Sequence, residues 1–232
     1  MHGNKALCPP LKVVYKTFMG TTAIIDYGMG NLHSVAKALA TVGPQEQIVV
    51  AHDPEVIRHA DRIVLPGVGA LKDCIAALTA RGLDEVVREC VQRQPMLGIC
   101  LGMQALFDFS EENGGTHGLG IIPGNVVHFK SPLVDDKGNR LKVPHMGWNE
   151  VTQRRAHPLW QGIAQNSRFY FVHSYFVAPQ QREVVVGETH YGAPFAAAVA
   201  VENLFAVQFH PEKSQAAGLQ LLANFLQWDG TF

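Results

Sequence analysis

A cysteine between two glycines is the feature that most constrains how this chain can fold. Cys100 is the centre of a Gly98-x-Cys100-x-Gly102 pattern, preceded by a short apolar segment that Pro95 opens. The residues after it, 103–107, have the composition of a helix start. A nucleophile on a strand-to-helix turn adopts a strained backbone, and only flanking glycines leave room for it. The pattern therefore predicts a buried strand, a tight turn and a helix, with the Cys100 sulfur above the edge of a sheet.

This position would suit Cys100 for nucleophilic chemistry. The N-terminus of the following helix favours the thiolate, which is the reactive form of cysteine. The backbone N–H of Leu101 would point to the place where an oxyanion forms. The alternative is a buried core cysteine, because free cysteine is among the most buried residue types. The paired glycines at the junction favour the nucleophile.

A histidine and a glutamate near the C-terminus are candidates for a base and its orienting partner. Residues 204–209 form an apolar, aromatic-rich segment that ends in His210-Pro211-Glu212. In extended backbone, side chains two positions apart leave on the same side, so Glu212 could orient the His210 imidazole while that ring serves the thiol. One His-x-Glu among eleven histidines is weak evidence, and a surface histidine is the alternative. The position at the end of a strand favours the catalytic interpretation. His173 is the competing base, but no carboxylate follows it two residues later.

A glycine-rich turn supplies a third candidate element. Residues 61–65 predict a strand that runs into Gly67-Val68-Gly69 and then into a helix. Backbone N–H groups of such a turn can donate to an oxyanion, together with the N–H of Leu101. An ordinary strand-to-helix turn is the alternative interpretation.

These motifs together resemble a known family. The three motifs follow one another in the order typical of the class I, or triad, glutamine amidotransferases, and the resemblance extends over residues 21–228. Two further stretches are similar to the branch of this family that comprises the glutaminase subunits of imidazole glycerol phosphate synthase. The stretches that carry both resemblances are 65–69, 98–104, 208–212, 24–34 and 144–149.

The resemblance implies a reaction and a set of site residues. Cys100 would attack the side-chain amide of glutamine, His210 would move the proton and Glu212 would hold the imidazole. The N–H of Leu101 would bind the oxyanion together with one N–H from the 67–69 turn. The groups that would hold the α-amino and carboxylate groups of glutamine are Gln104 and the backbone of His173, Ser174 and Tyr175.

The resemblance also implies a partner. A cyclase subunit, a (β/α)8 barrel, would receive the ammonia and form imidazole glycerol phosphate and an aminoimidazole carboxamide ribotide. A chain of 232 residues has no room for a second catalytic domain, which favours a separate acceptor subunit. Met146, Trp148 and Tyr170 are expected at the interface, because aromatic anchors dominate such surfaces. Core packing is the alternative for these three residues.

Other functions remain open at this point. One is the glutaminase of another amidotransferase, of the anthranilate or aminodeoxychorismate synthase type. The others are a cysteine peptidase or hydrolase of the same architecture, and a non-catalytic regulator. Peptide cleavage without glutamine turnover would favour the hydrolase, and an unreactive Cys100 would favour the regulator.

Composition narrows the class of protein. A formal net charge of −1 gives no basic field for nucleic acid, and no uncharged apolar run approaches the length of a membrane span. The four cysteines show no paired spacing, so we expect reduced thiols in a cytoplasmic protein. No set of histidine, cysteine and carboxylate residues has the spacing typical of metal ligands, and we expect neither a metal nor a cofactor.

The order of elements predicts an α/β fold. Strands at 22–26, 47–51, 61–65 and before Cys100 alternate with helices, which indicates a mostly parallel central sheet with helices on both faces. The resemblance implies a fold like that of the class I glutamine amidotransferases, which is flavodoxin-like. From Asn113 onward, short strands predict an antiparallel extension before a closing helix at 215–228. The expected short strands are 126–130, 148–152, 168–172, 184–188 and 196–201. Residues 21–232 are expected to form one amidotransferase domain, after a disordered extension over residues 1–20.

Overall fold

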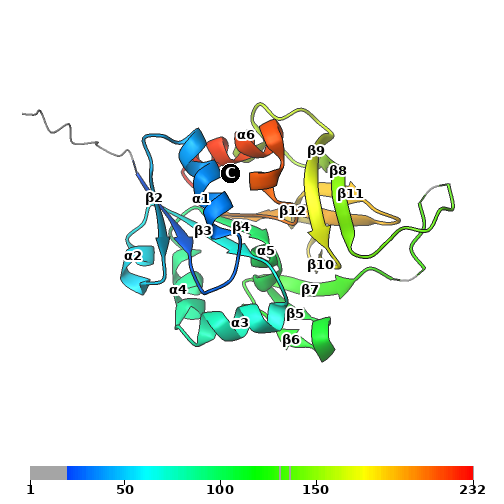
Figure 1. Cartoon of the computed structure of the whole chain (residues 1–232), viewed down its shortest axis with the longest axis horizontal. Coiled ribbons are helices and arrows are strands. Elements are labelled where there is room, and N and C mark those ends of the chain that lie inside the picture. The colour runs from blue at the N-terminus through cyan, green and yellow to red at the C-terminus, as the bar shows by residue number, and fades with distance from the viewer. Residues whose placement is uncertain (1–19, 131, 136, 232) are drawn as a thin grey trace, which may run out of the picture.

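The computed structural model describes residues 20–130, 132–135 and 137–231, and these residues form two sheets with helices packed around them (Figure 1). The strands of the larger sheet are β1 (Thr21–Ile25), β2 (Gln47–Ala51), β3 (Arg62–Gly67), β4 (Met96–Cys100), β8 (His145–Gln153), β9 (Ser167–His173), β11 (Val185–His190), β12 (Pro194–Val201) and β13 (Leu204–Val207). The strands of the smaller sheet are β5 (Phe107–Ser110), β6 (Thr116–His117), β7 (Ile122–His128) and β10 (Tyr175–Pro179). The α-helices are α1 (Leu32–Val42), α2 (Pro54–Arg58), α3 (Leu71–Thr79), α4 (Leu83–Cys90), α5 (Leu101–Ala105) and α6 (Gln215–Gln227).

The larger sheet is parallel in one half and antiparallel in the other. Its strand order is β2-β1-β3-β4-β13-β12-β11-β8-β9. The strands from β2 to β13 pair in parallel, and the remaining pairs are antiparallel. The predicted α/β class with a mostly parallel centre and an antiparallel extension is therefore confirmed. Because β3, β4 and β13 are neighbours, their carboxyl ends meet at one edge of the sheet.

Helices cover both faces of this sheet (Figure 1). Apolar side chains of α2, α3, α4 and α5 pack in one core, and those of α1 and α6 pack in the core on the opposite face. In α4 one apolar stripe is buried, with Leu83, Val86 and Val87 almost inaccessible to solvent. Asp53 caps α2 by accepting a hydrogen bond from the Glu55 N–H, as its position before Pro54 predicts.

The structure differs from the expectation in three ways, two of which concern the antiparallel extension. This extension is split between the antiparallel half of the larger sheet and a separate sheet of order β10-β7-β5-β6, in which β5 and β7 pair in parallel. The strands β5, β6 and β10 are not evident from the sequence. The helix after Cys100 was also expected to include Phe107, and this is wrong, because α5 ends at Ala105 and Phe107 begins β5.

The predicted disordered extension over residues 1–20 lies outside the described residues, except for Gly20. No helix in the described part of the chain is both long enough and apolar enough to cross a membrane.

Candidate active site

Cys100 stands at a strand-to-helix turn, as its flanking glycines predict. It is the last residue of β4 and directly precedes α5, with a φ of 53° and a ψ of −108°. This positive φ is a strained conformation for a residue with a side chain. Gly102 makes the turn possible, because a Cβ there would lie 1.9 Å from the Leu65 carbonyl oxygen. The Cys100 side chain is nearly buried, with 6% of the residue exposed.

His210 follows β13, the strand beside β4. The two strands pair in parallel, with Val207 opposite Ile99, so the chain leaves both strands at the same edge of the sheet. The Nδ1 atom of His210 lies 2.8 Å from Oε1 of Glu212, and the Glu212 side chain is inaccessible to solvent. The sequence therefore predicts the His–Glu pair correctly.

The backbone that forms this pair is not the one that the sequence suggested. Residues Pro211–Lys213 form a 3₁₀ turn in place of the expected extended segment. The Ser214 hydroxyl donates to the His210 carbonyl oxygen at 2.6 Å, which closes the turn. The Glu212 carboxylate thus reaches His210 from within a turn.

The surroundings of His210 favour its protonated form. Burial by itself would lower the pKa of this imidazole, but its interactions with the Cys100 thiol and the Glu212 carboxylate outweigh burial and raise the pKa to about 9. The Nε2 atom is buried and has no hydrogen bond of regular geometry. Contacts of this kind are often long in enzymes without substrate and tighten when it binds.

His173, the competing base, has a different environment. Its Nδ1 atom lies 2.8 Å from the Tyr175 carbonyl oxygen, and its Nε2 atom lies 3.1 Å from Nδ1 of His145. Burial lowers its pKa to about 3, so the ring is neutral at physiological pH. Without a carboxylate partner, His173 is a weaker candidate for the base than His210.

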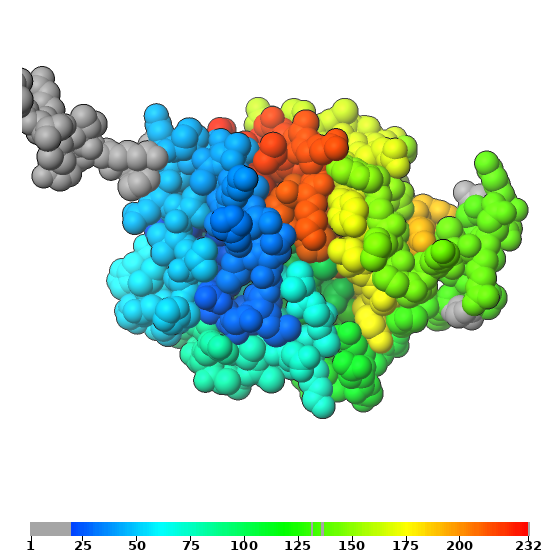
Figure 2. Space-filling model, in the orientation of Figure 1, coloured from blue at the N-terminus to red at the C-terminus, as the bar shows by residue number. Residues whose placement is uncertain are grey.

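A cavity of about 300 Å³ opens beside Cys100. It brings together residues from both halves of the chain, and Figure 2 shows the contributing segments side by side: the turn after β3 in cyan, the segment just before α6 in orange and β9 in yellow. All the residues that the sequence suggested for substrate binding line it. Of the turn, Val68 and Gly69 line the cavity, whereas Gly67 packs against Tyr27 and Leu101. The lining residues are Val68, Gly69, Cys100, Leu101, Gln104, Glu112, Pro144, Val172, His173, Ser174, Tyr175, His210 and Lys213.

Gln208 and Glu112 are two polar residues of the site to which the sequence analysis gives no role. Gln208 is fully buried; its amide nitrogen lies 3.7 Å from Sγ of Cys100, and its amide oxygen accepts from Gln104 at 3.0 Å. The sequence signal for Gln208 is its polar side chain within an otherwise apolar segment that leads to His210. Glu112 also lines the cavity, and its carboxylate accepts from the Leu71 N–H at 2.7 Å, at the start of α3. Nothing local in the sequence distinguishes Glu112 from other surface acids.

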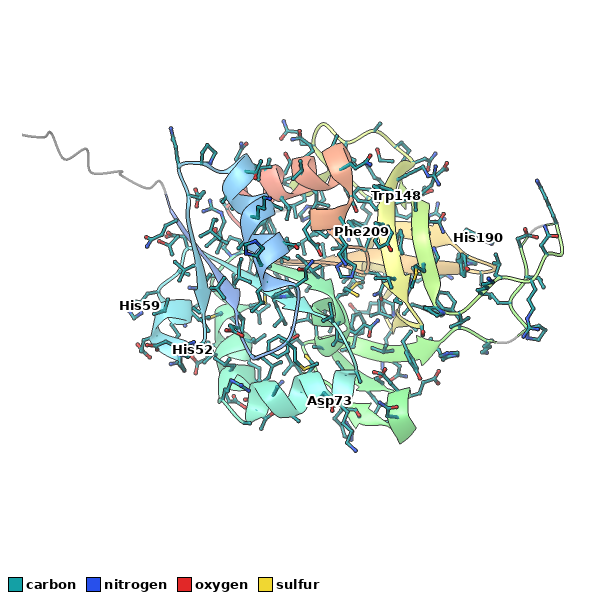
Figure 3. The ribbon with its side chains drawn as sticks, in the orientation of Figure 1. His52, His59, Asp73, Trp148, His190 and Phe209 are labelled. Atoms are coloured by element: carbon teal, nitrogen blue, oxygen red, sulfur yellow. The ribbon has the colours of Figure 1, made fainter. Side chains whose placement is uncertain are left out.

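The three residues expected at an interface form a partly exposed cluster. Met146 and Trp148 both lie on β8, and they are 62% and 37% exposed. Figure 3 labels Trp148. The Tyr170 ring on β9 packs edge-on against Trp148, with 6.1 Å between centroids. The Lys213 ammonium lies 6.0 Å above the Tyr170 ring, so this surface borders the cavity. Met146 and Trp148 therefore do not belong to the core.

The described residues contain no group of three histidine, cysteine or acidic side chains placed to hold a metal ion. Two histidines remote from the site, His52 and His59, lie near α2 on the opposite side of the molecule from Trp148 (Figure 3). Cys74 and Cys90 are buried free thiols in the helices beneath the sheet.

Comparison with known proteins identifies the family. The family described as glutamine amidotransferase class-I matches residues 23–228. The chain is 57% identical over 211 residues to the imidazole glycerol phosphate synthase subunit HisH of Aromatoleum aromaticum, covering 90% of this chain and 99% of that protein. It is equally similar, at 57% over 212 residues, to the protein of the same name from Pseudomonas putida, covering 91% of this chain and 99% of that protein.

Solved structures show the same fold at low sequence identity. A structure of PurLQS from Thermotoga maritima matches with a TM-score of 0.67 and 17% identity, covering 90% of this chain and 98% of that chain. A glutamine amidotransferase from the same organism matches with a TM-score of 0.59 and 13% identity, covering 92% and 97%. With a family match over nearly the whole described chain and relatives of 57% identity, this chain belongs to the class I glutamine amidotransferases.

Proposed function

We propose that this chain is the glutaminase subunit of an imidazole glycerol phosphate synthase, and that it hydrolyses L-glutamine to glutamate and ammonia for a cyclase subunit. The observation that carries the chemistry is the Cys100–His210–Glu212 arrangement beside a cavity of about 300 Å³. Support for the assignment to this synthase comes from relatives that bear its name and match over 99% of their length.

The proposed reaction uses one nucleophile and one proton carrier. His210 takes the thiol proton of Cys100, and the sulfur attacks the side-chain amide carbon of glutamine. As the tetrahedral intermediate collapses, the imidazolium gives its proton to the amide nitrogen, the carbon–nitrogen bond breaks and ammonia leaves. Water then attacks the γ-glutamyl thioester with His210 as the base, which releases glutamate and restores the thiol. The raised pKa of His210 suits its second task, because the imidazolium beside Cys100 keeps the proton until it passes it to the leaving nitrogen.

The oxyanion of this intermediate needs hydrogen-bond donors. We assign the Leu101 N–H, which starts α5, and one N–H from the Gly67-Val68-Gly69 turn. The register supports this pairing, because Gly67 lies opposite Cys100 on the neighbouring strands β3 and β4.

The amino-acid part of glutamine carries both charges, and the cavity offers a partner for each. Glu112 lines the cavity and is placed to accept from the α-ammonium group. Gln104 and the backbone of His173, Ser174 and Tyr175, which also line it, would hold the rest of the α-amino and carboxylate groups.

The acceptor of ammonia would be a (β/α)8-barrel cyclase, which forms imidazole glycerol phosphate and an aminoimidazole carboxamide ribotide. We assign its docking surface to Met146, Trp148 and Tyr170, because exposed aromatic and methionine side chains are typical anchors of interfaces. We place this biosynthetic activity in the cytoplasm, where cysteines remain reduced.

An isotope experiment tests this function. Glutamine labelled with ¹⁵N in its side-chain amide is supplied to the chain, the cyclase and its nucleotide substrate, with an excess of unlabelled ammonium in solution. We expect ¹⁵N in the imidazole product, because ammonia passes between the subunits without mixing with solvent. Glutamine hydrolysis with only unlabelled product would contradict the proposed partner, and an absence of glutaminase activity under all conditions would contradict the reaction.

A further inference from the structure

A row of hydrogen bonds, buried at its centre and partly buried at both ends, leads from β8 to the cavity, and it begins at Asn149. The Asn149 amide has a fixed orientation: its oxygen accepts from the Glu150 N–H at 2.8 Å, and its nitrogen donates to the His190 carbonyl at 2.9 Å. The second N–H of this nitrogen is left for Nε2 of His145, 3.3 Å away. Because alternate residues of a strand face the same side, His145 and Asn149 both lie on one face of β8.

The other end of the row fixes the tautomer of each histidine. The Tyr175 carbonyl oxygen can only accept, so Nδ1 of His173 carries the hydrogen in their 2.8 Å contact. In the neutral ring, Nε2 of His173 is then an acceptor, and Nδ1 of His145, 3.1 Å away on the strand opposite, has to donate. Nε2 of His145 is therefore the acceptor that Asn149 requires. All three bonds run in one direction, from Asn149 to Tyr175.

The surroundings keep both rings neutral, as this pattern demands. His145 is stacked between Phe171 and Tyr191, with centroids 4.9 Å and 4.0 Å away. Burial lowers the pKa of His145 to about 4 and that of His173 to about 3. Neither ring has an acidic side chain among its hydrogen-bond partners.

The row ends on groups that line the substrate cavity. The Tyr175 carbonyl that accepts from His173 also accepts from the Gln104 amide nitrogen at 2.9 Å. That nitrogen donates its other hydrogen to Gln208, which is itself beside the Cys100 sulfur. The position of the Gln104 amide is therefore set by a network that starts on β8.

We propose that Asn149 and His145 are positioning residues for glutamine binding, which act through His173 to hold the Tyr175 carbonyl and the Gln104 amide in place. This inference rests on the proposed role of Gln104 and the 173–175 backbone as the glutamine site. Since a neutral imidazole has one donor and one acceptor, reversing or removing one bond leaves a buried polar group without a partner.

A matched pair of variants at His145 separates hydrogen bonding from packing. Asparagine and leucine have nearly the same shape, but only asparagine has an N–H near the place of Nδ1. For His145→Asn we expect a glutaminase KM within about threefold of the original value. For His145→Leu we expect a KM about tenfold higher with little change in kcat, which corresponds to the loss of one buried hydrogen bond. Equal KM values for the two variants, or an unchanged KM in His145→Leu, would overturn the proposal.

A second variant reverses the direction of the row. In Asn149→Asp the carboxylate can only accept, so His145 has to place its hydrogen on Nε2, and we expect the KM to rise about tenfold. Asn125→Asp, at an exposed position of β7, adds the same charge elsewhere and should leave the KM unchanged. An Asn149→Asp enzyme that matches this control would contradict the inference.

Imidazole ¹⁵N NMR of the unmodified chain provides a readout that is independent of activity. We expect His145 and His173 both to carry hydrogen on Nδ1 and none on Nε2. A hydrogen on Nε2 of either ring would overturn the proposal even in an active enzyme. The expected tautomers in a chain that hydrolyses no glutamine would instead contradict the proposed function and leave the network in place.

Discussion

Gly102 packs so closely against Leu65 that an added Cβ would lie 1.9 Å from the Leu65 carbonyl oxygen. The first turn of α5 therefore rests directly on the backbone of β3. Because β3 runs into the Gly67-Val68-Gly69 turn, this contact joins the nucleophile to the loop that we assign to the oxyanion. The distance between the two depends on a position where only glycine fits.

Replacing Gly102 should therefore be far more damaging than replacing the other glycine of the motif. Gly102→Ala is expected to lower the free energy of unfolding by about 3 kcal/mol or more, because backbone would have to move. In Gly98→Ala the new methyl group meets the Ala206 Cβ at 3.0 Å, and we expect a loss of about 1 kcal/mol. Chemical denaturation of both variants measures the difference, and equal losses would contradict this account of the turn.

The strand-to-helix turn at Cys100 could be predicted because glycines mark its requirements in the sequence. Positive φ at Cys100 depends on its immediate neighbours, and although Gly102 approaches Leu65 from a distant part of the chain, the glycine itself reveals the close contact. The His210–Glu212 pair was predicted from a two-residue spacing, although the actual backbone is a 3₁₀ turn. The pairing was correct because the spacing brings the two side chains together in either geometry.

The rest of the site depends on contacts that no local pattern records. Gln208 reaches Gln104 and Cys100 across more than one hundred residues of sequence, and Glu112 reaches Leu71 across 41 residues. The strand β5 has only four residues, and its burial does not alternate from one residue to the next, so no clear pattern marks it in the sequence. Such features are set by tertiary packing, which overrides local propensity.

An electrophilic glutamine analogue should label Cys100 and spare the other cysteines. Cys74 and Cys90 are fully buried in helices away from the cavity, and we expect Cys8 to remain unmodified as well. Cys100→Ala should reduce glutamine hydrolysis by at least about 10⁴-fold, because the members of a catalytic unit fail together. Peptide mapping and a glutaminase assay check both results. Labelling at another cysteine, or full activity in the variant, would remove Cys100 from its proposed role.

The raised pKa of His210 predicts how stability changes with pH. The pKa of His210 in the folded state is about 9, whereas the ordinary pKa of histidine is about 6.5, so the folded state favours the protonated ring. This contribution is fully present below about pH 6.5 and is lost as the pH rises through about 9. We expect the free energy of unfolding to fall by at least about 1 kcal/mol over that interval. His210→Gln should flatten this part of the profile, and an unchanged slope in that variant would assign the effect to other groups.

Trp148 is expected to anchor the cyclase. Trp148→Ala should weaken binding to that subunit by about 2 kcal/mol, with little change in melting temperature, because the ring is 37% exposed in the free chain. Phe109, which is 36% exposed on β5, provides the matched control, and Phe109→Ala should leave affinity unchanged. Calorimetric titration and thermal unfolding measure the two quantities. A large loss of stability with unaltered affinity would return Trp148 to a structural role.

The isolated chain is expected to be a poor glutaminase that its partner activates. Gly69 adopts a φ of +95°, and glycines on both sides of Val68 lower the barrier to a flip of the peptide that faces the cavity. The turn can thus present either a carbonyl or an N–H to glutamine, and a missing oxyanion donor reduces the rate by about 10²–10³-fold. Adding the cyclase with its nucleotide ligand should therefore raise kcat at least about 100-fold with little change in KM.

Gly69→Ala should abolish this activation, because the substitution strains the backbone and brings a methyl group within 3.0 Å of the Met29 Cε. Stopped assays of glutamate release with and without the cyclase measure this activation. An isolated chain that already hydrolyses glutamine at the rate of the complex would rule out a peptide switch at this turn.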